Sequence, residues 1–307
     1  MNPQANAISE SSLESQAIAP AVISATRRMY WSVRRELWES RSIYIAPLAV
    51  AAVILVGFLL STVAGIWEKA LRLDPVQQSA KLAEPYSFAA LLIMLTTFIV
   101  GVFYCLDALH GERRDRSILF WKSLPVSDLT AVLSKASIPL VVLPLLTFAI
   151  TVATQWIMLL LSTLVLLVSG GGVSTLWTHL PLLQMWLLLL YHLVTVHALW
   201  YAPIFGWLLL VSAWARRAAF LWAALPLLAI GIVEKIAFHT SHFTALLGYR
   251  VSGGPESVTV APGSVLDPMT HLTPGHFLIS PGLWIGLAIA AAFLAAAVRL
   301  RRYQGPI

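Results

Sequence analysis

The chain has 307 residues, of which 59% are hydrophobic and only 11% are charged; a soluble domain carries about 25% charged residues. This composition excludes an ordinary soluble domain, and the long apolar runs predict an all-α polytopic membrane protein. The net charge of +6 follows the expected membrane topology, so it does not indicate nucleic-acid binding. Cys105 is the single cysteine, which excludes a disulfide within the chain and a cysteine metal site.

Residues 1–23 are expected to be a mobile cytosolic tail without a cleavable signal sequence. Residues 24–42 are expected to form an amphipathic helix. Its apolar stripe contains Met29, Tyr30, Val33 and Leu37, which share one face at 100° per residue. Such a helix lies in the membrane interface with its arginines at lipid phosphates, and a plain cytosolic extension of the next helix is the alternative. The residues beside the stripe are Arg27, Arg34, Arg41, Trp31 and Trp38.

Six apolar runs are long enough to cross about 30 Å of hydrocarbon. The third exceeds the length needed, so we expect it to tilt or to kink at Pro139 and Pro144. Pro203 lies inside the fourth. The predicted spans cover residues 43–66, 86–109, 136–168, 180–214, 218–238 and 281–298 of a transmembrane domain at 43–302, with a long outer loop at 239–280.

The basic residues are distributed unevenly between the two predicted sides. If the N-terminus lies inside the cell, the inner segments hold fifteen of the twenty Lys and Arg residues. The outer segments then hold five. The positive-inside rule therefore predicts six spans with both termini in the cytosol.

A charged segment at residues 111–135 separates the second and third spans. Residues 112–123 are expected to form one helix with a basic start and an apolar middle at 118–121. A helix of this kind either docks onto a partner or rests on lipid headgroups, and the sequence leaves both open. The basic residues of the segment are Arg113, Arg114, Arg116, Lys122 and Lys135, and its acidic residues are Glu112, Asp115 and Asp128.

A helix break is expected after this basic helix. Pro125 cannot continue the backbone hydrogen-bond ladder and restricts Leu124 before it. Ser127 is a favourable N-cap for the next helix, and Asp128 in the first turn suits the helix dipole.

The sequence lacks the residue patterns that ATP hydrolysis and ion-coupled transport usually require. A P-loop needs lysine after glycine, and no glycine in this chain is followed by lysine, so we do not expect the chain to be an ATP-hydrolysing enzyme by itself. Ion-coupled carriers place a carboxylate in the middle of a span. Asp107 and Glu234 lie near span ends instead, which counts against an ion-coupled secondary carrier but leaves it as an alternative.

The histidines give the best argument for an enzyme, an outer-face metalloenzyme of the membrane. Five are predicted on the outer side near Asp267, without the HExxH spacing of a zinc protease. The alternative is that they form hydrogen bonds at the headgroup level. His192 and His197, inside the fourth span, are expected to form hydrogen bonds between helices. The five outer histidines are His179, His239, His242, His271 and His276.

Taken together, six spans, an amphipathic helix before the first and a charged loop between the second and third resemble the membrane subunit of an ABC-2 type ABC transporter. In that family the loop begins with acidic and basic residues, continues with a Leu-Pro-Val-Ser-like break and ends near a lysine. The matching residues here are Glu112-Arg113-Arg114-Asp115-Arg116-Ser117, Leu124-Pro125-Val126-Ser127 and Lys135.

The resemblance implies an export permease subunit of the plasma membrane, such as a bacterial inner membrane. Two membrane subunits, expected to be copies of this chain, would pair with two cytosolic ATPase subunits that bind ATP and magnesium. The helix at 112–123 would be the coupling helix that contacts the ATPase, and residues 24–42 the connecting helix. A path lined by Leu, Trp and Tyr favours an apolar or amphipathic substrate. The coupling residues so implied are Glu112, Arg113, Arg114, Asp115, Arg116, Ile118, Leu119, Phe120, Trp121 and Lys122.

Overall fold

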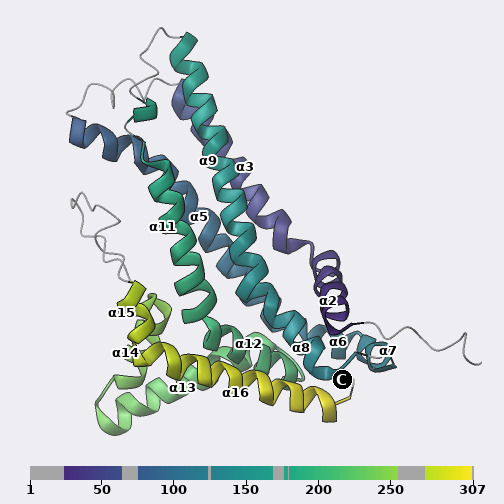
Figure 1. The fold of residues 1–307 in the computed structure, drawn as a ribbon. Coiled ribbons are helices and arrows are strands. Elements are labelled where there is room, and N and C mark those ends of the chain that lie inside the picture. Colours follow the sequence, from purple (N-terminus) through teal and green to yellow (C-terminus); the bar gives the residue numbers. More distant parts are fainter. Residues whose placement is uncertain are drawn as a thin grey trace, which may run out of the picture.

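The computed structural model describes residues 24–63, 75–123, 126–168, 176–178, 180–254 and 274–305, and within these ranges all regular structure is helical (Figure 1). Six helices there are long and apolar enough to cross a membrane. The chain is therefore a multi-pass membrane protein, as its composition predicts. The six candidates are Ser42–Thr62, Lys81–Arg114, Asp128–Val168, Leu176–Trp200, Ala219–Phe238 and Pro281–Tyr303.

Helix α2 (Ala25–Glu39) forms over the predicted amphipathic stretch. Its N-cap is Ser24, whose side chain accepts a hydrogen bond from the Arg27 amide. The residues of the apolar stripe do not all have the same surroundings. Val33 and Leu37 pack against the core of the protein, whereas Tyr30 is 58% exposed. Part of the stripe thus holds α2 to the rest of the chain and does not enter lipid.

Three long helices pack against one another along most of their length: α3 (Ser42–Val63), α5 (Pro75–Ala108) and α9 (Leu143–Val168). Figure 1 shows them side by side. Away from α2, their contact includes Phe58 and Tyr86, with ring centroids 6.0 Å apart, and the fully buried Met158. Helix α3 accommodates Pro47 because it lies near the helix start, where a missing donor costs least.

The third apolar run is continuous from α8 (Asp128–Ser137) through the π-helical segment η1 (Ile138–Val142) into α9. It begins eight residues before the predicted start at residue 136. The wider π turn forms around Pro139, which has no amide hydrogen for the regular ladder. Of the two prolines at which a kink is predicted, Pro139 thus lies in a π-helical segment, whereas Pro144 lies within regular α9.

The expectation of one unbroken span at residues 180–214 is wrong. The run divides into α11 (Leu182–His192), the π-helical segment η2 (Leu193–Trp200) and α12 (Ala202–Trp214). Pro203 lies in the first turn of α12, where a proline is tolerated, and it ends the preceding ladder at Tyr201. Because of this break, α12 does not continue α11 but lies lower in the molecule (Figure 1).

The last third of the chain forms α13 (Ala219–Phe238), α14 (His242–Val251), α15 (Pro274–Ile279) and α16 (Pro281–Tyr303). Helix α16 packs closely on α12. The approach is close at Gly206, where an added Cβ would lie 3.3 Å from the Ala290 carbonyl oxygen. Figure 1 shows α12, α13 and α16 together across one end of the longer helices.

Candidate functional site

The charged segment does not form the single helix predicted at residues 112–123. It forms α6 (His110–Arg114) and α7 (Ser117–Ser123), separated at Arg116, whose φ of 58° is left-handed. A left-handed residue cannot continue a right-handed helix. Leu124 and Pro125 lie outside the described residues. The predicted cap is confirmed, since Ser127 accepts a hydrogen bond from the Thr130 amide at 3.1 Å.

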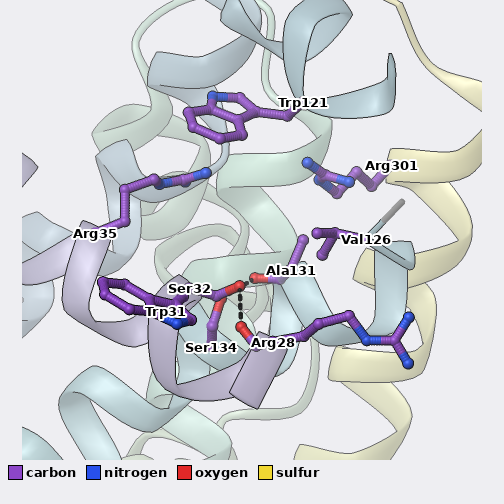
Figure 2. A pocket seen from close by; sticks show the side chains of 9 residues that line it. All are labelled: Arg28, Trp31, Ser32, Arg35, Trp121, Val126, Ala131, Ser134 and Arg301. Atoms are coloured by element: carbon purple, nitrogen blue, oxygen red, sulfur yellow. Dashed lines mark hydrogen bonds between the residues drawn. The ribbon is translucent and has the colours of Figure 1, made fainter. Parts of the chain in front are cut away.

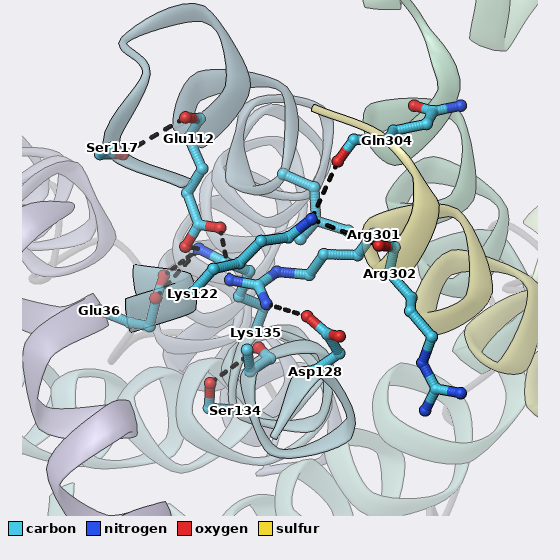
Figure 3. Close-up of polar contacts among 12 residues, drawn as sticks. Glu36, Glu112, Ser117, Lys122, Asp128, Ser134, Lys135, Arg301, Arg302 and Gln304 are labelled. Atoms are coloured by element: carbon cyan, nitrogen blue, oxygen red, sulfur yellow. Dashed lines mark hydrogen bonds and ion pairs between the residues drawn. The ribbon is translucent and has the colours of Figure 1, made fainter. Parts of the chain in front are cut away.

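Six charged side chains from four helices meet where α6 joins the body of the protein. We call them the charge cluster. It contains three carboxylates and three cations, so it is neutral as a whole. Most of these side chains are buried, and Figure 3 shows how several of them converge. The members are Arg35 and Glu36 of α2, Glu112 of α6, Asp128 and Lys135 of α8, and Arg301 of α16.

Glu36 fastens α2 to two other helices. Its carboxylate accepts hydrogen bonds from Lys135 Nζ, at 3.0 Å to each oxygen, and from the Tyr104 hydroxyl of α5 at 2.8 Å. Glu36 and Lys135 are each 3% exposed. A buried charge is stable only when it is paired and hydrogen-bonded. The position of α2 is thereby fixed relative to α5 and α8.

Glu112 fastens the charged segment to three helices. Its carboxylate lies 3.1 Å from Arg35 Nη2, 3.2 Å from Lys135 Nζ and 3.1 Å from Arg301 Nη2. Arg301 also pairs with Asp128. Glu112 is 6% exposed, so it is part of the protein interior and not of a free surface.

The environment of Arg35 explains how a half-buried guanidinium is kept charged. Burial lowers the pKa of Arg35, but the carboxylates of Glu36, Glu112 and Glu39 together raise it above its usual value. The guanidinium carbon also lies 3.7 Å from the centroid of the Trp121 ring. This cation–π contact attaches α7 to α2.

Arg113 makes a separate attachment to α12. Its Nη1 donates to the Ala213 carbonyl at 2.6 Å and to the Ala215 carbonyl at 3.3 Å. The last carbonyl groups of a helix have no hydrogen-bond partner within the helix, so Arg113 supplies the missing donor at the end of α12. The Ser212 hydroxyl accepts hydrogen bonds from the amides of Leu109 and His110 at 3.0 and 2.9 Å. The charged segment and the end of α12 therefore form one unit.

A pocket of about 300 Å³ lies between α2, α7 and α8 beside the charge cluster. Figure 2 shows the guanidinium groups of Arg35 and Arg301 near the indole of Trp121, with Trp31 of α2 on another side. On α7 itself, Leu119 and Phe120 are 59% and 60% exposed. At this end of the molecule, the exposed apolar side chains of α7 therefore lie next to a pocket that is partly lined by arginine guanidinium groups.

The ten predicted coupling residues fall into two groups. Glu112, Arg113 and Ile118 are buried, and Trp121 is half-buried beneath Arg35. Their roles are internal, and the expectation of one exposed helix face does not describe them. Lys122 Nζ donates to the Gln304 carbonyl at 3.1 Å (Figure 3). The exposed residues are Arg114, Asp115, Arg116, Leu119, Phe120 and Lys122.

The predicted connecting-helix residues also differ from one another in exposure. Arg27, Tyr30 and Trp38 are exposed on α2. The Arg34 guanidinium carbon lies 5.0 Å from the centroid of the Trp38 ring, whereas Leu37 packs inward. Sequence reasoning missed Glu36, which lies beside Leu37. A carboxylate next to the apolar stripe of a basic helix was the signal for it.

Asp107, near the inner end of the second predicted span, lies close to the charged segment. It is exposed and forms an ion pair with Arg114, with Oδ1 3.6 Å from Nη1. Arg113 is directed to the end of α12 instead, because α6 turns it toward the interior.

The histidines do not assemble in the part of the chain that the structure describes. No group of three His, Cys, Asp or Glu residues with metal-binding geometry occurs there. His239 and His242 are exposed, while His179, His271 and Asp267 lie outside the described residues. His197 is 2% exposed among Phe98, Tyr201 and Phe205. Its Nε2 makes no hydrogen bond to any described residue, contrary to the expected bond between helices.

The chain was compared with protein-family models, with curated proteins and with solved structures, and none of the three comparisons gives a match.

Proposed function

We propose that this chain is the permease subunit of an ATP-driven ABC-2 type exporter, powered by a separate cytosolic ATPase. The observation that carries the proposal is the attachment of the charged segment by Glu112. Its ion pairs connect α6 to α2, α8 and α16. A loop that only joins two spans needs no buried connection of this kind, whereas a segment that receives force does.

The arrangement gives a mechanical route from α7 into the transmembrane helices. A partner would contact the exposed Leu119 and Phe120 and place a side chain in the neighbouring pocket. Displacement of α7 would pull on α2 through Trp121 and Arg35, and displacement of α6 would move α8 and α16 through Glu112. The ion pairs are buried, so the helices are expected to move together and not to slide past one another.

The charge distribution supports the cytosolic placement of this end. The four segments predicted to lie inside the cell are α2, the charged segment, the turn after α12 and the end of α16. They contact one another directly, so a single aqueous side accommodates all of them. We further propose that two copies of the chain pair in the membrane, that ATP and magnesium bind in the ATPase, and that the substrate is apolar or amphipathic.

The test is purification of the tagged full chain from its native membranes with measurement of ATP hydrolysis in the preparation. We expect magnesium-dependent hydrolysis that is lost, together with the ATPase subunit, in the double variant Leu119→Asp/Phe120→Asp. Ile118 and Trp121 are left unchanged because they pack internally. The control is Tyr303→Ser, which removes an aromatic side chain that is 75% exposed at the same end. Retention of the ATPase by the double variant, or its absence from the unmodified preparation, would contradict the proposal.

A further inference from the structure

A second site lies away from the charge cluster, in a cavity of about 710 Å³ between α12, α13, α14 and α16. Binding sites for small molecules have volumes of roughly 300–1,000 Å³ and mostly apolar walls with a few polar groups. This cavity has that character. Its walls include Trp207, Leu227, Leu247, Ile289 and Phe293.

Arg250 is the one charged residue among the described residues that line the cavity. Its guanidinium carbon lies 4.1 Å from the centroid of the Trp200 ring, and its Nη1 donates to the Gly282 carbonyl at 3.0 Å. Its Nη2 is buried and makes no hydrogen bond to any described residue. A guanidinium group thus faces an apolar space with part of its hydrogen-bonding capacity unused.

The backbone around Arg250 leaves room for this group. A Cβ atom added at Gly286 would overlap with Arg250 Nη2. Only a glycine allows the guanidinium to rest against α16 at this point. The conformation of Arg250 therefore depends on a residue of another helix, and a side chain at Gly286 would displace it.

The carboxylate on α13 does not neutralise Arg250. Glu234 accepts hydrogen bonds from the Thr240 hydroxyl at 2.9 Å and from the amides of His242 and Phe243 at 2.6 and 2.9 Å. The Glu234 carboxylate thus supplies hydrogen-bond acceptors for the first amides of α14. Burial lowers the pKa of Arg250, although an arginine remains protonated in a protein. Among the described residues, no carboxylate forms an ion pair with Arg250. A cation without an anion is unfavourable in apolar surroundings, so a bound anion would stabilise this site.

We propose that this cavity binds a single-chain anionic amphiphile, whose carboxylate pairs with Arg250 Nη2 while its hydrocarbon chain lies against the apolar walls. A second copy of the chain fits the site less well. In a two-fold contact it would present the same surface, whose charge is again the cation of Arg250. The proposal stands on the geometry of the cavity alone and does not rest on the proposed export function.

The test is equilibrium binding of radiolabelled palmitate to the purified full chain in a non-ionic detergent, with protein-free micelles as background. We expect saturable binding of about one palmitate per chain. Arg250→Gln is expected to weaken palmitate binding at least tenfold, because a charge-assisted pair is lost. Hexadecanol, which has the same chain without the charge, is expected to bind the unmodified protein and Arg250→Gln equally.

Two further variants separate loss of the ligand contact from loss of the fold. Gly286→Ala displaces the guanidinium and is expected to weaken palmitate binding while hexadecanol binding is retained. Lys235→Gln removes an exposed cation of α13 outside the cavity and is expected to leave palmitate binding unchanged. Absence of saturable palmitate binding to the unmodified chain would overturn the proposal. Equal palmitate binding by the unmodified chain and Arg250→Gln, or a cross-linked dimer in which a second copy fills the cavity, would also overturn it.

Discussion

Lys135 Nζ lies 3.0 Å from both carboxylate oxygens of Glu36, although the two residues are 99 positions apart in the sequence. Each side chain is only 3% exposed, so this is an interior ion pair and not a surface contact. Exposed ion pairs contribute about 0–1 kcal/mol, whereas removing one partner of a buried pair leaves an uncompensated charge. The pair therefore has a structural consequence, which is to fix α2 against α8.

Replacement of Lys135 by Met should destabilise the protein by about 3 kcal/mol, because Glu36 and Glu112 lose a shared cation in a buried place. The measurement is thermal unfolding of the purified chain in detergent, followed by circular dichroism. Lys81→Met is the matched control. Its exposed pair with Glu84 should contribute less than about 1 kcal/mol. Equal melting temperatures for Lys135→Met and Lys81→Met would show that the charge cluster does not hold the helices together.

The adjacent arginines of α6 should behave differently. Arg113→Met should lower stability by about 2 kcal/mol, since the carbonyls of Ala213 and Ala215 lose a charged donor. Amide hydrogen exchange at residues 214–220 should become faster because the end of α12 is no longer held. Arg114→Met should leave this exchange unchanged, since Arg114 is exposed and its ion pairs are with Asp107 and Asp115. Identical exchange in both variants would contradict the attachment of the charged segment to α12.

Gly206→Leu should destabilise the contact between α12 and α16. Its Cβ would already lie 3.3 Å from the Ala290 carbonyl oxygen, and the remaining side-chain atoms have to displace one helix. Overpacking of this kind costs about 2 kcal/mol. Gly57→Leu is the control, because no atom lies within 4 Å of its added Cβ. A Gly206→Leu protein that melts at the same temperature as Gly57→Leu would refute the close approach of these helices.

The sequence predicts the parts of the fold that depend on local patterns. Long apolar runs identify membrane-spanning helices because nothing else satisfies the backbone in lipid. Ser127 is identified as an N-cap because its hydroxyl is followed by a helical pattern with Asp128 in the first turn. Such features depend on a few consecutive residues, so no tertiary contact is needed to recognise them.

The charge cluster could not be predicted in the same way. The partners of Glu112 are distant in sequence, and nothing in a local pattern indicates that Arg301 approaches it from the last helix. The prediction of one helix over residues 112–123 fails at Arg116. The side chain of Arg116 is compatible with a helix, but its backbone is left-handed. Once α6 and α7 are separate, Glu112 and Arg113 turn inward, and the exposed surface shrinks to Leu119, Phe120 and the charged residues near them.

The most direct test of the central claim, that force enters through α7 from a cytosolic ATPase, is site-specific cross-linking in inside-out native membrane vesicles. A benzophenone maleimide would be attached to the variant Leu119→Cys, and the native thiol of Cys105 is buried and should not react. We expect the cross-linked product to contain the ATPase subunit, identified by mass spectrometry, and to be absent when the probe is attached to Lys81→Cys at the far end of α5. Labelling of Leu119→Cys only in right-side-out vesicles, or a product that contains lipid and no ATPase, would contradict the account.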